Sequence, residues 1–387
     1  MTMTFLLTEE QLEFKRSVRR FARDKVAPRA ASIDEQSDFP RDLYQLLGNQ
    51  GLLGLTVPET YGGSGGDLIA ACLAAEELGR SSGSFAPRVG VATMIAETII
   101  EGGTPEQIER WVKPIVNGEC IPAIALTEPE AGSDALSLQT TAIKRDGGWR
   151  IDGTKRFITN ADIADVILML CRLGDGGVDG FGAFLIEQGT PGIEVTTVYP
   201  KMAGAALHAC EVAIDGAFVS SDSLLGEGSL PVGFIHSMSK GRLIVSAVGV
   251  GIAAEATGIA ARYATERKQF GRPIMKFQGI SFMLADMLTK VEASRALLYE
   301  AAAIYANNPE RGAGFASMAK LLSTDTAMEV TTDAVQVLGG AGYTKSFPLE
   351  RMMREAKLLQ IYEGTNQIQR MLVARHLEQW NETLEDA

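Results

Sequence analysis

The chain has 387 residues, of which 46% are hydrophobic and 22% are charged. This apolar fraction is enough for a large buried core and excludes extensive disorder, and the length predicts two or three domains. The 36 basic and 48 acidic side chains give a net charge of −12. Such an acidic chain is a poor general binder of nucleic acid or anionic membranes unless its basic residues cluster.

Apolar runs, cysteines and histidines indicate in which cellular compartment the protein works and whether it binds a metal. The longest apolar run, Leu243 to Ala254, has about twelve residues and contains Ser and Gly, so no run reaches the 18 or so residues of a membrane span. The first residues lack the basic segment, apolar stretch and cleavage site of a secretory signal. The four cysteines form no CxxC pair and the three histidines form no cluster. We therefore expect a cytoplasmic protein without a disulfide framework or a metal site.

Helical periodicity dominates residues 1–118. Thr8 and Gln11 match a capping box, and the apolar residues that follow at helical spacing predict a helix that Pro28 ends. Further apolar helical stretches cover 41–51, 67–79 and 88–101, and a Gly-rich loop is predicted at 57–66. This region is predicted to be an N-terminal helical domain.

The period changes in residues 119–228. Asp146-Gly147-Gly148 lies between alternating segments and predicts a β-hairpin. Short β-rich stretches follow at 166–170, 181–187, 193–198 and 211–214. We expect a central antiparallel β domain.

Residues 229–387 return to helical spacing, and the last 150 residues hold only three prolines. Long stretches rich in Ala, Leu and Met cover 232–267, 277–306, 312–338 and 349–380. Four long helices with short connections predict a C-terminal four-helix bundle. The expected fold class is therefore α+β and mostly α.

Several short motifs carry groups that suit a cofactor, and each also has an ordinary structural interpretation. The loop 125–134 offers hydroxyls and glycines that could donate to a heteroaromatic ring or to phosphate, or it is simply a turn. Phe157 and Thr159 would share one side of a strand, as a stacking and hydrogen-bonding pair or as part of a half-buried strand. The basic cluster 266–272 suits phosphate or a helix C-terminus. The glycines of 339–342 suit a helix end or a close approach to a diphosphate.

Glu363 lies between an aromatic residue and a glycine. An apolar flank raises the pKa of a carboxyl and makes it usable as a general base. Most single Glu residues are surface charges, so this motif alone leaves both interpretations open.

As a set, these motifs resemble the acyl-CoA dehydrogenase family from Leu7 to about Leu377. The matching stretches occur in the family's order and at its spacing: 57–66, 125–134, 157–160, 266–274, 336–343 and 360–370. The resemblance implies FAD-dependent α,β-dehydrogenation of an acyl thioester, acyl-CoA to trans-2-enoyl-CoA, with FAD between the β domain and the C-terminal bundle. It further implies a homotetramer built as a dimer of dimers, and an electron-transferring flavoprotein as the electron acceptor.

The resemblance also assigns site residues, position by position. Glu363 matches the family's most common catalytic base, and no metal is implied. The positions that match FAD contacts are Leu126, Thr127, Gly132, Ser133, Phe157, Thr159, Arg267, Phe270, Gln278, Gln336, Gly339, Gly340, Thr365 and Gln367. Of these, Arg267, Phe270 and Gln278 resemble residues that reach the FAD of a neighbouring subunit. The substrate positions are Ser133, Ser239, Arg242, Tyr362 and Gly364.

Departures from the family pattern concern the acyl carrier. Members often have Asp where this chain has Ser239, and Arg and Ser where it has Ala205 and Leu207. Ser346 also replaces a common acidic residue, and Phe157 replaces a common Trp. Losing polar contacts to the CoA nucleotide predicts weak use of acyl-CoA compared with the same acyl group on an acyl carrier protein; neutral drift is the other interpretation. A flavin oxidase or monooxygenase on the same scaffold, and a non-catalytic binding protein, are the competing function classes.

Overall fold

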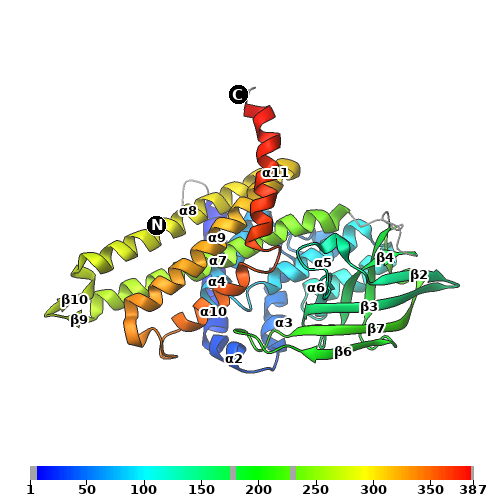
Figure 1. Ribbon diagram of the computed structural model, residues 1–387, viewed down its shortest axis with the longest axis horizontal. Coiled ribbons are helices and arrows are strands. Elements are labelled where there is room, and N and C mark those ends of the chain that lie inside the picture. Colours follow the sequence, from blue (N-terminus) through cyan, green and yellow to red (C-terminus); the bar gives the residue numbers. More distant parts are fainter. Residues whose placement is uncertain (1–6, 175–179, 227–231, 385–387) are drawn as a thin grey trace. The chain divides into compact units, whose positions relative to one another are not determined.

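The computed structural model describes residues 7–174, 180–226 and 232–384 (Figure 1). Its contacts group the chain into two compact units. The helical unit contains the described residues of Met1–Asp34, Asp67–Pro87 and Ser239–Ala387, and the sheet unit contains those of Glu35–Gly66 and Arg88–Met238. The helices of the first hundred residues are thus divided between the units, and the division into domains 1–118, 119–228 and 229–387 stays a prediction.

The helical unit begins with the predicted capping box. The Thr8 hydroxyl accepts a hydrogen bond from the Gln11 N–H, and the Gln11 side chain accepts one from the Thr8 N–H, both at 3.1 Å, which starts α1 (Glu9–Phe21). The predicted stop at Pro28 is wrong. A π-helical turn (Ala22–Val26), a 3-10 turn (Ala27–Arg29) and α2 (Ala30–Glu35) continue the helical path, because a proline in the first turn of a helix needs no N–H partner.

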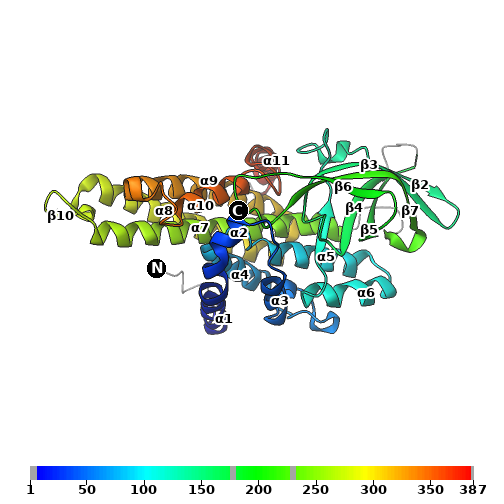
Figure 2. The ribbon, with the colours of Figure 1, turned by 90° about the horizontal axis from the view of Figure 1, so that it is seen from below.

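Long helices make up most of the unit, as Figures 1 and 2 show. They are α4 (Leu68–Ser81), α8 (Gln278–Asn307), α9 (Pro309–Leu338), α10 (Leu349–Leu359), α11 (Asn366–Leu384) and, from Ser239 onward, α7 (Val232–Glu266). A small hairpin, β9 (Lys268–Gln269) and β10 (Arg272–Pro273), joins α7 to α8. The single helix predicted over 349–380 is wrong, because α10 and α11 are separated at residues 360–365.

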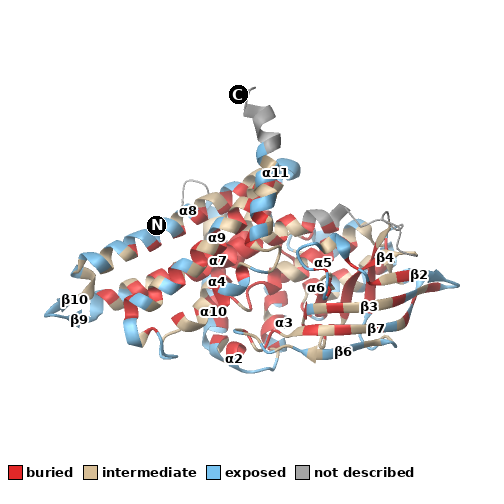
Figure 3. Cartoon of the chain, viewed as in Figure 1, coloured by how far each residue is buried: buried red, intermediate tan, exposed pale blue. Residues whose placement is uncertain are grey.

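Helix α7 shows that the expectation of no apolar segment long enough to span a membrane is wrong. By length and composition its segment Ser237–Glu266 is apolar enough to cross a membrane, since isolated Ser and Gly residues lower the average hydropathy little. However, 78% of its most apolar stretch is buried within the chain, and Figure 3 shows buried residues recurring along the helix. Burial of this kind is expected for the core helix of a bundle.

A buried carboxylate, Glu76 on α4, connects three helices of the helical unit. It accepts hydrogen bonds from Lys15 Nζ at 3.2 Å, Arg295 Nε at 3.1 Å and the Tyr299 hydroxyl at 2.7 Å. Burial by itself raises the pKa of Glu76, but the attraction of Lys15, Arg295 and Arg80 outweighs it and lowers that pKa to about 2. The ionised form is therefore the one that the fold stabilises.

We expect Glu76→Gln to lower the free energy of unfolding at neutral pH by roughly 2–3 kcal/mol, because the buried cations lose their counter-charge. A depressed carboxyl pKa contributes stability above the unfolded value, and this contribution is lost as the pH falls. The difference between wild type and variant should therefore shrink between pH 4.5 and about 2. Urea denaturation over this range measures it, with exposed Glu300→Gln on α8 as the control. A difference that is constant with pH would contradict the assignment.

The sheet unit packs helices beside one mixed sheet. Its helices are α3 (Arg41–Asn49), α5 (Arg88–Gly102) and α6 (Pro105–Val116). Its strands are β1 (Pro122–Ala125), β2 (Thr141–Arg145), β3 (Gly148–Thr159), β4 (Val166–Leu173), β5 (Phe181–Glu187), β6 (Ile193–Val198), β7 (Ala209–Ser220) and β8 (Leu224–Leu225). The predicted hairpin is confirmed, since Arg145 pairs with Gly148 across the turn.

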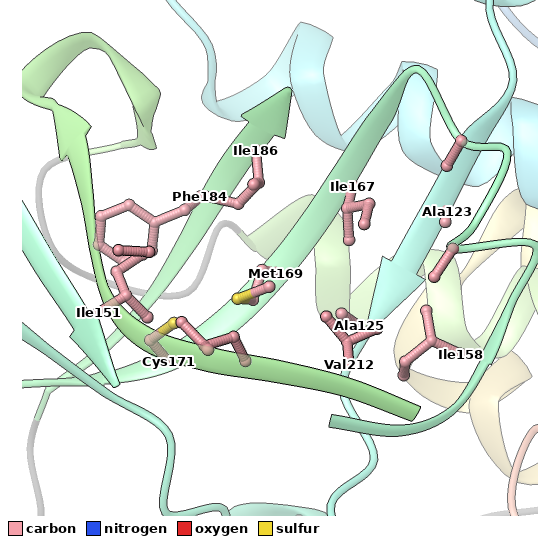
Figure 4. Packing of buried hydrophobic residues seen from close by; sticks show 14 of the residues in the cluster. Ala123, Ala125, Ile151, Ile158, Ile167, Met169, Cys171, Phe184, Ile186 and Val212 are labelled. Atoms are coloured by element: carbon pink, nitrogen blue, oxygen red, sulfur yellow. The ribbon is translucent and has the colours of Figure 1, made fainter. Parts of the chain in front are cut away.

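The strand order is β6-β7-β3-β2-β4-β5-β8, with β1 beside β4. The pairs β1–β4 and β2–β4 are parallel, and the other pairings are antiparallel. The expected α+β class is confirmed, with a mostly antiparallel sheet. Buried side chains of the sheet form an apolar cluster that includes Ile151, Met169, Phe184 and Val212 (Figure 4).

All four cysteines are free and buried. Burial raises the pKa of every one of these thiols, to about 12 for Cys120 and Cys171 and to about 11 for Cys210, and raises that of Cys72 as well.

Candidate active site

The loop between α10 and α11 has an unusual backbone. Glu363 has φ +55° and Gly364 has φ +85°, and a positive φ is uncommon for a residue with a side chain. The Asn366 N–H donates to the Gln360 carbonyl at 3.0 Å and closes the loop. The Thr365 hydroxyl accepts from the Ile368 N–H at 3.3 Å and caps α11. The loop therefore presents Glu363 from a fixed turn between two helix ends.

The Glu363 carboxylate is partly buried and accepts no hydrogen bond from the described residues. Burial raises its pKa, and the attraction of Arg242 and Lys320 offsets only part of this effect. The main-chain N–H of Glu363 also donates to no acceptor in the described part of the chain. A carboxylate with a raised pKa beside an available N–H donor is suited to removing a proton next to a carbonyl group.

Gly241 on α7 leaves room for this carboxylate. A Cβ atom added at Gly241 would lie 3.0 Å from Oε2 and 3.4 Å from the carboxyl carbon of Glu363. The 3.0 Å contact with Oε2 is tighter than ordinary packing, so a side chain there would displace the carboxylate. The glycine thus lets the backbone of α7 approach Glu363 closely.

We expect Gly241→Ala to lower kcat about tenfold, because a few tenths of an ångström of carboxylate displacement disturbs proton transfer. The melting temperature should change little, since the crowded atoms are the end of a flexible side chain. Gly258→Ala on the same helix is the matched control, because its added Cβ would meet only Arg262 Nη1 at an ordinary 3.4 Å. Steady-state kinetics of the two variants make the comparison, and equal rates would show that the close approach is unimportant.

The predicted substrate residues of the helical unit surround the loop. Ser239 is buried with 6% of its surface exposed, and its hydroxyl accepts from Arg242 Nη1 at 3.5 Å. Burial lowers the pKa of Arg242 and the neighbouring Glu363 raises it. Tyr362 and Gly364 are partly buried beside Glu363. The structure thus brings Ser239, Arg242, Tyr362 and Gly364 together around Glu363.

The predicted cofactor residues of the helical unit fall into two groups. Thr365 and Gln367 lie next to Glu363, whereas Arg267, Phe270 and Gln278 lie at the β9–β10 end of the unit (Figure 1). Arg242 and Glu266 are separated by 24 residues of α7, or about 36 Å at 1.5 Å per residue. One chain therefore does not bring these two groups into a single site.

The remaining predicted contacts of this unit lie at the end of α9. Gln336, Gly339 and Gly340 are exposed, and Gly339 has φ +59°. A Cβ added at either glycine would meet nothing within 4 Å. The backbone here is open to a ligand or to another chain.

In the sheet unit, the predicted cofactor loop follows β1 and is anchored by Glu128. The buried Glu128 carboxylate accepts from the N–H groups of Gln139 and Thr140, at 2.5 and 3.0 Å, and from Lys155 Nζ at 2.7 Å. Burial raises the pKa of Glu128, but Lys155 and these hydrogen bonds lower it overall. This anchor leaves Gly132 and Ser133 exposed at the tip, and Leu126 and Thr127 partly buried at the base.

Phe157 lies on β3 with φ +59°, where a bulge interrupts the pairing with β7. The regular alternation behind the expected Phe157–Thr159 pair is therefore broken, although Phe157 is 55% exposed and Thr159 is partly exposed. The Arg156 guanidinium lies 5.0 Å from the Phe157 ring centre, and the Tyr199 ring lies 5.2 Å away. These neighbours hold an exposed aromatic ring in a strained backbone position.

These features fit the dinucleotide that the resemblance implies. In the sheet unit, an exposed aromatic ring, hydroxyls on an anchored loop and open backbone at Gly132 can contact a planar ring or phosphate. In the helical unit, the open backbone at Gly339 and Gly340 can approach a phosphate. Sequence patterns alone did not single out Gly241, Lys320, Gln369, Glu128 and Lys155. A lysine inside an otherwise apolar helical stretch was the available signal for Lys320; the others had none.

Three family models match the chain. They are the N-terminal, middle and C-terminal domains of acyl-CoA dehydrogenase, over residues 8–119, 123–217 and 234–378. An acyl-CoA dehydrogenase of Bacillus subtilis is 41% identical over 96% of this chain and 98% of its own length. A short-chain-specific acyl-CoA dehydrogenase of Clostridium acetobutylicum is 38% identical over 96% and 99%.

Solved structures show the same similarity. Butyryl-CoA dehydrogenase from Megasphaera elsdenii has a TM-score of 0.90 and 36% identity, covering 96% of this chain and 98% of its own. The FAD complex of PigA has a TM-score of 0.91 and 31% identity over 96% and 98%. The prolyl acyl carrier protein oxidase AnaB has a TM-score of 0.90 and 30% identity over 96% and 99%.

Proposed function

This chain belongs to the acyl-CoA dehydrogenase family of FAD-dependent oxidoreductases, and from that premise we propose that it converts an acyl-CoA to the trans-2-enoyl-CoA with Glu363 as the base. The observation that carries the proposal is the partly buried Glu363 carboxylate, which accepts no hydrogen bond from the described residues and has a raised pKa. A surface Glu would be hydrated and have an ordinary pKa, so the surface-charge interpretation is not supported.

The residues around Glu363 have distinct parts in this reaction. Glu363 removes the proton alpha to the thioester, and its own main-chain N–H is available to donate to the carbonyl oxygen as negative charge develops there. One such donor stabilises the transition state by roughly 3 kcal/mol. Arg242 holds positive charge beside the loop, and Gly241 leaves space for the carboxylate. Bound FAD supplies the acceptor for the hydride that leaves the beta carbon.

The resemblance assigns FAD contacts in each unit separately. Those of the sheet unit are Leu126, Thr127, Gly132, Ser133, Phe157 and Thr159, and those next to Glu363 in the helical unit are Thr365 and Gln367. Arg267, Phe270, Gln278, Gln336, Gly339 and Gly340 are assigned to the FAD of a neighbouring subunit. The 92% exposure of Phe270 and the length of α7 support this division. The assembly is then a homotetramer, the acceptor an electron-transferring flavoprotein, and the compartment a reducing cytoplasm in which four free thiols persist.

A substrate tethered to an acyl carrier protein is the second candidate. Leu207 is apolar and buried with 5% exposure, so it offers no polar group to a CoA nucleotide. The matched AnaB structure is a prolyl acyl carrier protein oxidase. A carrier protein needs no nucleotide contacts, because its pantetheine arm ends in one phosphoserine.

Anaerobic reduction of the flavin tests both candidates. The yellow enzyme is mixed with one acyl group carried either by CoA or by an acyl carrier protein, and kcat/KM is measured for each. Bleaching by an acyl-CoA is expected for the proposed function. The missing polar contacts predict a preference of about tenfold or more for the carrier protein; equal or better values with CoA would reject the second candidate. The same turnover can be followed with an artificial electron-accepting dye or with oxygen as the acceptor. An enzyme that consumes oxygen but does not reduce the dye would be an oxidase.

A further inference from the structure

Lys320 on α9 is a lysine with no exposed surface. Fully buried lysines are rare, because an ammonium group must be paired to leave water. Its Nζ donates to the Gly364 carbonyl and to Asn366 Oδ1, both at 2.8 Å. A buried cation therefore binds the carbonyl of the residue that follows Glu363.

Asn366, which accepts from Lys320, also donates to two further residues of α9. Its Nδ2 donates to Asp325 Oδ1 at 2.6 Å and to the Thr324 hydroxyl at 2.9 Å. Gln360, at the other end of the loop, donates to the same Asp325 oxygen at 2.7 Å. Both ends of the loop are thus held by consecutive residues of one helix, next to Lys320.

Gln369 on α11 is a second donor to the backbone of this loop. Gln369 Nε2 donates to the carbonyls of Glu363 and Gly364, at 3.2 and 3.0 Å. The two residues with positive φ therefore have their carbonyls fixed by Lys320 and Gln369 together. A strained backbone persists only where its surroundings determine it in this way.

Lys320 also interacts electrostatically with the Glu363 carboxylate. The groups that influence these two residues come from three helices: Arg242 from α7, Lys320 and Asp325 from α9, and Arg370 from α11 through its ion pair with Asp325. Burial lowers the pKa of Lys320 to about 8, and Glu363 and Asp325 oppose this effect. The Lys320 charge in turn lowers the pKa of Glu363.

We propose that Lys320 is a positioning residue for the catalytic base: it holds the Gly364 carbonyl so that Glu363 keeps its orientation, and its charge stabilises the ionised carboxylate. This inference deepens the proposed function and rests on Glu363 being the base. It extends the active site to a residue that makes no contact with the Glu363 carboxylate itself.

The test is Lys320→Met in the FAD-loaded full-length enzyme, with exposed Lys290→Met on α8 as the matched control. We expect kcat to fall about 100-fold, since loosening the loop misplaces the base, while KM changes less than threefold. Removing a positive charge raises the carboxyl pKa, so the acid limb of kcat/KM should move to higher pH by about one unit. An unshifted limb with normal kcat would overturn the proposal.

Gln369→Met separates the two effects and remains informative if Lys320→Met fails to fold. It removes the other donor to the loop but no charge, so kcat should fall while the acid limb stays in place. A Gln369→Met enzyme with wild-type kcat would contradict the loop-holding argument. Normal activity of Glu363→Gln would instead show that the proposed function is wrong, whereas an inactive Glu363→Gln beside a normal Lys320→Met would reject only the Lys320 inference.

Discussion

Glu363→Gln should reduce the rate of flavin reduction by an acyl thioester on the order of 1,000-fold, because general base catalysis contributes 10²–10⁴-fold. Glutamine has nearly the same shape but cannot accept a proton. The wild-type carboxylate accepts no hydrogen bond from the described residues, so the replacement breaks no hydrogen bond among them. FAD content and melting temperature should therefore stay close to wild type.

Stopped-flow reduction under anaerobic conditions measures this effect directly. The matched control is Glu329→Gln on α9, an exposed Glu that pairs with Lys290, and its reduction rate should be normal. In the wild type, kcat/KM should rise with pH through a pKa above that of an ordinary carboxyl, because burial raises the pKa of Glu363 and only the ionised form is a base. Reduction at more than a tenth of the wild-type rate in Glu363→Gln would place the base elsewhere.

Lys155→Met should destabilise the protein by roughly 3–5 kcal/mol and release FAD. Lys155 is fully buried, and its Nζ donates to Glu128 Oε1 at 2.7 Å and to the Leu126 carbonyl at 3.2 Å. Removing one partner of a buried ion pair leaves the other charge uncompensated, which is the costly case. Because Glu128 anchors the loop that carries Thr127 and Ser133, cofactor affinity should fall with stability.

Chemical denaturation and flavin release measure the two effects separately. Lys144→Met on β2 is the control, since Lys144 is exposed on the same sheet. The double variant Lys155→Met with Glu128→Gln should recover part of the loss, because a neutral amide can still accept the two loop N–H bonds. A loss below about 1 kcal/mol in Lys155→Met would mean that the pair is solvated and does not anchor the loop.

Local patterns were sufficient to predict some of the regular elements. The stretches 181–187 and 193–198 coincide with β5 and β6, and the capping box at Thr8 starts α1 as expected. Each depends on neighbouring residues alone: a period of two, or a hydroxyl three positions before a Gln. The assignment of the whole chain to its fold class followed from such segments taken in order.

The break between α10 and α11 could not be predicted in this way. Leu358, Leu359 and Ile361 continue the apolar helical spacing into the loop, so the periodicity shows no interruption. The turn is imposed from outside the segment, by Lys320 on α9 and Gln369 on α11. Buried polar residues such as Lys155 were missed for the same reason, because a lysine by itself is typical of a surface.

The four buried thiols have a practical consequence for watching this protein unfold. Alkylating reagents attack the thiolate, and burial with a raised pKa leaves Cys72, Cys120, Cys171 and Cys210 both inaccessible and un-ionised in the native state. Labelling must therefore wait for a local or global opening. Since Cys72 lies in the helical unit and the other three in the sheet unit, peptide-resolved alkylation would time the opening of each unit separately, without any introduced probe.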